Sequence, residues 1–234
     1  MRKPFRFKQF DIFQDQTAMK VGTDGVLLGA WAELKQGKYV LDIGSGTGLI
    51  SLMLAQRYTE AIIDAVELDE FAYRQTEENF LNSKFSSRLS IYQNAIQTYQ
   101  STIKYDLIVS NPPFFINNER VELDARKTAR QQETLTFDEL LNKTKELLAE
   151  NGKAAFIIPF DLEHQFLSIA KNLGLFPQRL LHIKGNAEAS FKRSIIELGF
   201  HSTNPVITEL IIELERHQYT DDYIQLTKEF YLKM

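Results

Sequence analysis

From Tyr39 to Pro159 the sequence alternates between short β-rich segments and segments with helical periodicity. This alternation is typical of right-handed βαβ units, because two parallel strands need a crossover, usually a helix, to join them. The predicted strands are Tyr39–Ile43, Ala61–Glu67, Arg88–Gln93, Tyr105–Ser110 and Gly152–Pro159, and the predicted helices are Thr47–Tyr58, Phe71–Lys84 and Phe137–Glu150. The pattern therefore predicts an α/β fold with a mostly parallel central sheet and helices on both faces.

The pattern changes after about residue 176. Three β-rich runs follow without a helix of comparable length between them, and they predict antiparallel edge strands at Arg179–Ile183, Ser194–Phe200 and Thr208–Glu215. Asp221–Leu232 predicts a terminal helix with Thr220 as its N-cap. Since the 234 residues contain no repeat, low-complexity tract or linker, we expect a single domain, residues 39–234, with an N-terminal extension, residues 1–38, packed on it.

Composition excludes several classes of chemistry. The chain has no cysteine, which rules out disulfides, thiolate metal sites and a cysteine nucleophile. The four histidines show no ligand spacing and no paired acid, so no metal is expected; they are His164, His182, His201 and His217. No apolar run approaches the roughly 20 residues of a membrane-spanning helix, and the first residues lack the apolar stretch of a signal peptide, which predicts a cytoplasmic protein.

A formal net charge of −4 does not by itself indicate a nucleic-acid partner, so any such contact has to come from local basic patches. The first ten residues form one candidate patch, with the basic residues Arg2, Lys3, Arg6 and Lys8 among the aromatic residues Phe5, Phe7 and Phe10. Such residues can hold a phosphate backbone and stack bases. The alternative is that the phenylalanines pack on the domain while water solvates the charges.

Three glycines at alternate positions, Gly44, Gly46 and Gly48, lie between a predicted buried strand and a helix. Glycine permits a tight turn and a close approach of the backbone to a ligand. Glu67 closes the next strand, where an acid can accept hydrogen bonds from both hydroxyls of a ribose. The loop reads Gly-x-Gly-x-Gly, with Leu49 next, and this spacing disfavours a dinucleotide. The two features together predict an adenosine-containing cofactor.

The fourth predicted strand ends in Asn111, Pro112, Pro113 and Phe114. An exocyclic amine on a base is a poor nucleophile, because its lone pair is delocalised into the ring. The Asn111 side-chain oxygen and the Pro112 carbonyl can accept its two hydrogens and favour the pyramidal nitrogen that attacks a methyl donor. The prolines preset the backbone, and Phe114 offers a ring on which a base can stack. The alternative is a simple turn that ends the strand.

These motifs resemble known methyltransferases. Asp42 with the three glycines resembles the Asp-x-Gly-x-Gly-x-Gly loop of class I methyltransferases, although Asp42 can also act as a turn cap. The segment Lys20–Trp31 and the Asn-Pro-Pro-Phe motif are similar to the bacterial tRNA1(Val) adenine-N6 methyltransferase family, and the resemblance covers nearly the whole chain.

The resemblance implies S-adenosylmethionine as cofactor and tRNA as substrate. It implies that the cofactor contacts Asp42, Gly44, Gly46, Gly48, Glu67, Leu68, Asn94 and Ala95, and that Asn111, Pro112, Pro113 and Phe114 hold the adenine. Asn94 departs from the usual aspartate, but its amide oxygen can still accept from an adenine amino group. Lys20 and Thr23 are further cofactor candidates, with a plain helix start capped by Thr23 or Asp24 as the alternative.

Two basic segments are candidates for binding tRNA phosphates. The long connection Phe115–Thr136 contains Arg120, Arg126, Lys127 and Arg130, but a salt-bridged helix is the alternative because acids are interspersed. Lys192 and Arg193 are the other pair.

The sequence thus predicts N6-methylation of an adenosine in tRNA, at the position that the resemblance implies, beside the anticodon of valine tRNA. The same motif is compatible with guanine N2 in ribosomal RNA, adenine in DNA, or a protein glutamine. A non-catalytic nucleotide-binding RNA assembly factor is the alternative from another class, and a nicotinamide dehydrogenase is disfavoured by the loop spacing. A monomer is compatible with the sequence.

Overall fold

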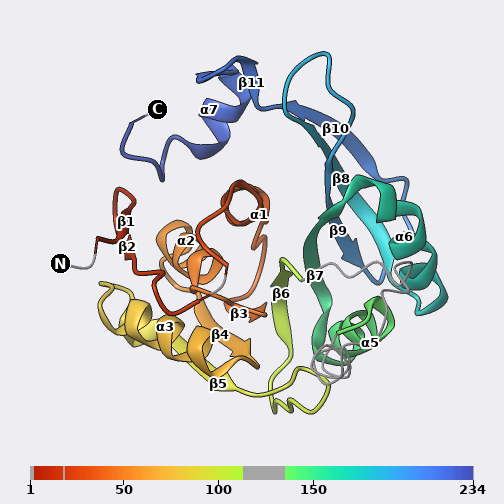
Figure 1. Ribbon diagram of the computed structural model, residues 1–234. Helices are drawn as coiled ribbons and strands as arrows, with labels where there is room; N and C mark the ends of the chain where they lie inside the picture. The colour runs from red at the N-terminus through yellow and green to blue at the C-terminus, as the bar shows by residue number, and fades with distance from the viewer. Residues whose placement is uncertain (1–2, 18, 113–134, 234) are drawn as a thin grey trace, which may run out of the picture.

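The computed structural model describes residues 3–17, 19–112 and 135–233. One eight-stranded sheet lies between two layers of helices (Figure 1). In sheet order its strands are β10 (Val206–Ile211), β8 (Phe176–Lys184), β9 (Arg193–Gly199), β7 (Leu148–Pro159), β6 (Tyr105–Ser110), β3 (Tyr39–Ile43), β4 (Ile62–Glu67) and β5 (Leu89–Gln93). Two short hairpins lie outside this sheet, β1 (Phe5–Arg6) with β2 (Asp11–Ile12) and β11 (Glu213–Glu215) with β12 (Gln218–Tyr219).

The sheet separates two hydrophobic cores. Because successive side chains of a strand point to opposite faces, Val40 lies in one core and Leu41 in the other. The first core is covered by α1 (Thr23–Trp31), α2 (Leu49–Arg57), α3 (Glu70–Leu81) and α7 (Asp221–Thr227), and the second by α5 (Phe137–Leu147) and α6 (Glu163–Asn172) (Figure 1). The α/β arrangement with helices on both faces is therefore confirmed.

Most predicted elements lie within a few residues of their expected bounds, and β3 and β6 match them at both ends. α5 ends earlier than predicted, because Leu148 already pairs with Tyr105 of β6. The Thr220 hydroxyl accepts from the Tyr223 N–H, which confirms the predicted N-cap of α7. α6 was not predicted, although Phe166 and Ala170 at i and i+4 are its buried residues.

The antiparallel pairing predicted for the C-terminal strands is confirmed for β9, but the direction predicted for β10 is wrong. β9 runs antiparallel to both of its neighbours, β7 and β8, but β10 runs parallel to β8. The reason is the position of β8 in the sheet: β9 and β10 lie on either side of it, so two successive chain reversals give β8 and β10 the same direction. The antiparallel strand of this region is thus an internal strand, and the edge strand is parallel.

The N-terminal phenylalanines pack on the body of the molecule. Phe7 and Phe10 are buried, and their rings stack with centroids 4.8 Å apart, while the Phe7 ring also stacks on Tyr231 at 5.7 Å. The Lys8 N–H donates to the Phe230 carbonyl at 2.8 Å, which ties this hairpin to the C-terminal end of the chain. The aromatic residues therefore serve packing, while Arg6 and Lys8 remain exposed.

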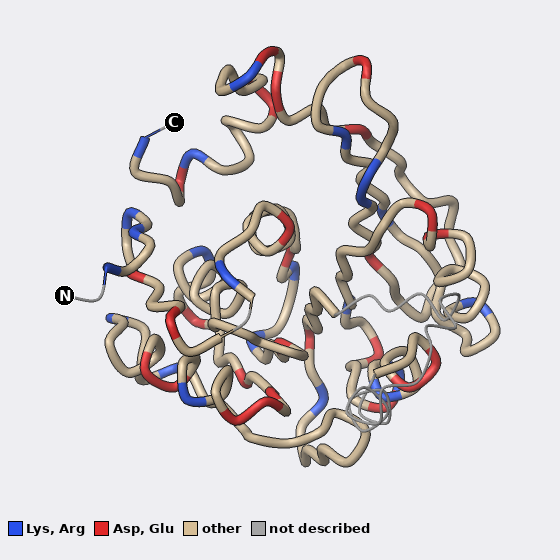
Figure 2. The backbone as a smooth tube through the Cα atoms, viewed as in Figure 1, with Lys and Arg blue, Asp and Glu red and all other residues tan. Residues whose placement is uncertain are grey.

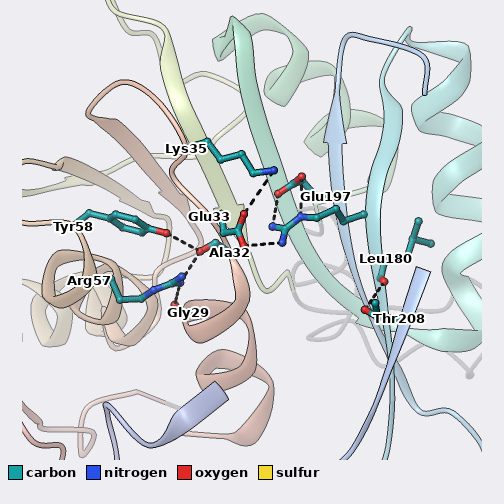
Figure 3. A network of polar contacts seen from close by, with 10 residues as sticks. Gly29, Ala32, Glu33, Lys35, Arg57, Tyr58, Leu180, Glu197 and Thr208 are labelled. Carbon is teal, nitrogen blue, oxygen red and sulfur yellow. Dashed lines mark hydrogen bonds and ion pairs between the residues drawn. The ribbon is translucent and has the colours of Figure 1, made fainter. Parts of the chain in front are cut away.

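A charged network fixes the end of α1 to the sheet (Figure 3). The Arg179 guanidinium donates to the Glu197 carboxylate at 3.1 and 2.6 Å and to Glu33 at 2.9 Å, and it lies 4.1 Å from the Trp31 ring. Glu197 is only 1% exposed, so the hydrogen bonds from Arg179 replace the water that its carboxylate loses on burial. The buried pair Arg179–Glu197 therefore joins β8 to β9, and the contacts of the same guanidinium with Trp31 and Glu33 attach the end of α1 to these strands.

Candidate functional site

The carboxyl ends of β3 and β6 form the topological switch point of the sheet. The chain continues from β3 to β4 and β5 on one side and then returns to β6 on the other side. Ligands of open α/β sheets bind at this kind of crevice. Ile43 pairs with Ser110, and the Ser110 hydroxyl donates to the Ile43 carbonyl at 2.8 Å. Gly44 and Asn111 therefore leave adjacent strands, which lie about 5 Å apart in a sheet.

The three loop glycines have left-handed φ angles of 73°, 60° and 76°. A Cβ at Gly44 or Gly46 would meet nothing within 4 Å, whereas a Cβ at Gly48 would lie 2.6 Å from Cε1 of Phe80. The first two glycines thus leave open space beside the loop, and the third permits α3 to pack closely. The open space is the cradle that an adenosine-containing cofactor requires, so this loop fits S-adenosylmethionine.

Substitution of these glycines should separate binding from stability. We expect Gly46→Ala to raise the Kd for S-adenosylhomocysteine at least tenfold. It should lower the free energy of unfolding only by the backbone strain, about 1–2 kcal/mol. We expect Gly48→Ala to lower the free energy of unfolding by about 3 kcal/mol, because overpacking against Phe80 adds to the same strain. Calorimetry and urea unfolding of both variants measure the two quantities, and equal stability losses in the two variants would contradict this division.

Glu67 and Asn94 lie beside the glycine loop. The Glu67 carboxylate accepts from the Gly46 N–H at 2.9 Å and from the Asp69 N–H at 3.0 Å, and the Asn94 N–H donates to the Glu67 carbonyl at 3.0 Å. The Asn94 amide oxygen accepts from the Thr98 hydroxyl at 2.7 Å, which leaves one acceptor direction on that oxygen. Leu68 is 46% exposed at the same edge, next to Glu67. The structure therefore brings the predicted ribose and adenine contacts to one place, together with Ala95.

Asp42 is fully buried below the loop. Its Oδ2 accepts from both the backbone N–H and the hydroxyl of Ser51, at 3.2 and 2.7 Å, so it helps to hold the first turn of α2. Its Oδ1 is buried without a partner. Burial raises the pKa of Asp42 to about 6, the bonds from Ser51 oppose this rise, and the nearby Glu67 charge adds to it. The unpartnered oxygen fits a ligand that brings a positive or donating group to this loop.

Asp42 should make stability depend on pH. A carboxyl whose pKa is higher in the folded chain than in the unfolded chain stabilises the fold while protonated, and this contribution is lost as the pH rises through the folded pKa. The ordinary pKa is 3.8 and the pKa in the folded chain is about 6. As the pH rises between these two values, we expect the free energy of unfolding of wild type to fall by about 3 kcal/mol relative to that of Asp42→Asn. Urea unfolding of both chains across this pH window measures the difference, and a pH-independent difference would contradict the assignment.

The segment before β3 begins α1 beside the same loop. Gly22 is the N-cap residue, so the alternative that Thr23 or Asp24 caps this helix is wrong, and both lie in its first turn. Asp24 instead accepts a hydrogen bond from the Arg193 guanidinium at 2.7 Å. Arg193 is one of the predicted tRNA contacts, and this ion pair occupies part of its guanidinium. A Cβ on Gly25 would lie 3.1 Å from Leu49, so the start of α1 lies next to the start of α2. Lys20 and Thr23 are exposed near this point.

The motif predicted to hold the adenine lies only partly within the described residues. Asn111 is half-buried and Pro112 is buried at the end of β6. Pro113, Phe114 and the basic candidates Arg120, Arg126, Lys127 and Arg130 lie outside the described residues.

One histidine does have an acid partner, contrary to the sequence-based expectation. His182 Nε2 lies 2.9 Å from the Glu163 carboxylate, which also accepts from the Ser194 hydroxyl. The hydroxyl bonds to the acid and not to the imidazole, so this cluster does not form a nucleophile–base pair. Sequence reasoning missed it because its residues lie on α6, β8 and β9, which come together only in the folded sheet.

Charge pattern, metal-ligand pattern and helix hydropathy add three further findings. Figure 2 shows basic and acidic residues interspersed along the described part of the chain. Among the residues that the structure describes, there is no group of three or more His, Asp or Glu side chains that could hold a metal. None of the described helices combines the length and apolar character needed to cross a membrane.

A glycine loop at the switch point of this sheet, with an acid closing the next strand, defines a class I methyltransferase. The comparisons agree: residues 17–175 match the methyltransferase small domain family. The fold is similar to a predicted O-methyltransferase from Agrobacterium tumefaciens (14% identity, TM-score 0.68, covering 88% of this chain and 96% of that chain). It is also similar to TYW2 from P. horikoshii in complex with MeSAdo (18% identity, TM-score 0.57, covering 81% and 67%).

Curated relatives narrow the class. The tRNA1(Val) (adenine(37)-N6)-methyltransferase of Christiangramia forsetii is 47% identical, with 99% of each chain covered. The enzyme of the same name from Flavobacterium johnsoniae is 46% identical, covering 98% of this chain and all of the relative. This chain belongs to that methyltransferase family. It is an enzyme, and its cofactor is S-adenosylmethionine.

Proposed function

We propose that this enzyme transfers the methyl group of S-adenosylmethionine to N6 of an adenine in tRNA, and that the acceptor is adenosine 37 of tRNA1(Val). The observation that carries the proposal is the pairing of Ile43 with Ser110, since it supports a cofactor at Gly44 beside an amine at Asn111. The names of the relatives support the acceptor. Because tRNA is the substrate, we place the enzyme in the cytoplasm.

In this proposal each residue has a defined task. The glycines of the loop and Asp42 hold the methionine part, while Glu67 binds the ribose and Leu68, Asn94 and Ala95 bind the adenine of the cofactor. Lys20 and Thr23 close the methionine side. The bound cofactor supplies an electrophilic methyl group.

The chain's own residues prepare the acceptor amine. The Asn111 side-chain oxygen and the Pro112 carbonyl accept the two N6 hydrogens and so direct the nitrogen lone pair toward the donor. Pro113 and Phe114 complete this motif by fixing the backbone and stacking on the base. Neither a metal nor a covalent enzyme intermediate is required by these tasks. Residues 39–234 form the methyltransferase domain, with residues 1–38 as an extension packed on it.

The test is transfer of labelled methyl groups into bulk RNA from cells that lack this enzyme, followed by nuclease digestion and mass spectrometry of the nucleosides. We expect N6-methyladenosine in the tRNA fraction, and its loss when adenosine 37 of tRNA1(Val) is replaced by guanosine. Label in ribosomal RNA, DNA or protein would keep the chemistry and overturn the acceptor. Absence of label in tRNA, ribosomal RNA, DNA and protein, with normal binding of S-adenosylhomocysteine, would favour the non-catalytic binding factor.

A further inference from the structure

Three neighbouring polar side chains of α3 are buried where a helix on a sheet normally presents apolar residues. Gln75 and Thr76 are 0% exposed and Asn79 is 1% exposed. Burial of an amide or hydroxyl is unfavourable unless it is hydrogen-bonded. The partners of these three side chains therefore show what this face of α3 is built to hold.

Both polar atoms of the Asn79 side chain form hydrogen bonds, and these bonds join two separate parts of the chain. Its Oδ1 accepts from the Phe13 N–H at 2.9 Å, and its Nδ2 donates to the Phe13 carbonyl at 2.8 Å and to the Thr47 carbonyl at 2.9 Å. Phe13 belongs to the N-terminal segment, and Thr47 lies between Gly46 and Gly48. One side chain thus bridges the N-terminal segment and the glycine loop.

The two buried polar residues one turn earlier on α3, Gln75 and Thr76, extend this bridge in both directions. The Gln75 Oε1 accepts from the backbone N–H groups of Asp15 and Gln16, each at 3.1 Å. The Thr76 hydroxyl donates to the Gly46 carbonyl at 3.0 Å. This face of α3 therefore positions the backbone of residues 13–16 and the backbone of the glycine loop together.

The held segment leads to the start of α1. The Gln14 Oε1 accepts from the Val21 N–H at 2.7 Å, which connects residues 13–16 to the stretch that contains Lys20. Lys20 itself is exposed, as is Met19 at 59%. A displacement of residues 13–16 would therefore also displace the stretch before α1.

We propose that Asn79 is a positioning residue that couples the glycine loop to residues 19–22 before α1, so that binding of S-adenosylmethionine and the position of Lys20 stabilise each other. The inference rests on the proposed cofactor site. It assigns the coupling to a helix residue outside the glycine loop and outside the acceptor motif. Such coupling is reciprocal. The factor by which the held position of residues 19–22 strengthens cofactor binding is therefore also the factor by which the bound cofactor favours that position.

Tryptic cleavage after Lys20, identified by mass spectrometry of the fragments, reports how firmly residues 19–22 are held. In the wild-type chain, we expect saturating S-adenosylhomocysteine to slow this cleavage about tenfold, within the usual range of coupling between two sites. In Asn79→Ala, we expect faster cleavage, loss of this protection, and a roughly tenfold higher Kd for S-adenosylhomocysteine. KM for S-adenosylmethionine should rise with it, while kcat changes much less.

The control is Leu81→Gln, since Leu81 lies on the same helix and is 71% exposed. It should behave as wild type in cleavage and in binding. Gln14→Ala provides a second variant for the case that Asn79→Ala does not fold, because Gln14 is only half-buried. Gln14→Ala should also speed cleavage and weaken binding, by a smaller factor.

The outcomes separate the inference from the proposed function. Faster cleavage in Asn79→Ala with an unchanged Kd would overturn the coupling, and so would Gln14→Ala that cleaves faster but binds normally. Wild type that binds S-adenosylhomocysteine without protection of Lys20 would overturn it as well. Wild type that does not bind S-adenosylhomocysteine at all would instead overturn the proposed cofactor site.

Discussion

Asn111→Ala is expected to lower kcat for tRNA methylation at least 100-fold, the usual cost of removing one preorganised contact to a transition state. The reason is that alanine removes the side-chain acceptor at the end of β6, beside the start of the glycine loop. The amine would then keep only the Pro112 carbonyl as acceptor, and its lone pair would stay delocalised. Single-turnover methyl transfer under saturating tRNA and S-adenosylmethionine measures this effect on the chemical step.

Two comparisons make this result specific. Asn111→Asp keeps an acceptor oxygen, so it should retain more activity than Asn111→Ala. The Kd for S-adenosylhomocysteine should stay within about threefold of wild type in both variants, because an interaction made only in the transition state does not contribute to ground-state binding. Turnover of Asn111→Ala within tenfold of wild type would remove this residue from the reaction.

Arg179→Met is expected to lower the free energy of unfolding by about 3 kcal/mol, because it leaves the Glu197 charge buried without its partner. The substitution also removes the bond from the Arg179 guanidinium to Glu33 (Figure 3). It removes the contact of the guanidinium with the Trp31 ring as well. For a chain of this size, such a loss corresponds to a fall in Tm of roughly 6–12 °C. Urea unfolding and a thermal scan give the two values.

The control for this variant is Lys35→Ala, because the Lys35 side chain is 57% exposed at the rim of the same network. An exposed ion pair contributes little, so its stability should differ from wild type by less than about 1 kcal/mol. The double variant Arg179→Met with Glu197→Leu should regain most of the lost stability, since it removes the buried charge itself. A double variant as unstable as Arg179→Met would show that apolar packing of the arginine stem is the cause instead.

The α/β alternation, the bounds of β3 and β6 and the cap at Thr220 were predictable from the sequence. Each depends on residues that are close in the chain: an apolar run of strand length, a glycine that permits a left-handed φ, or a hydroxyl three residues before the N–H that it caps. The glycine loop, Glu67 and the Asn111–Pro112 pair were predictable for the same reason, because each ends a strand that its own sequence predicts.

The tertiary structure alone decided which distant residues meet. The direction of β10 follows from the place of β8 in the sheet, and the pairs Arg193–Asp24 and His182–Glu163 join elements that local patterns do not relate. The amide of Asn79 gives no signal in the sequence, since its partners Phe13 and Thr47 lie 66 and 32 residues away. Helical and strand periodicity report which face of an element is apolar, whereas the partner of a buried polar group is set by how the whole sheet and its helices pack.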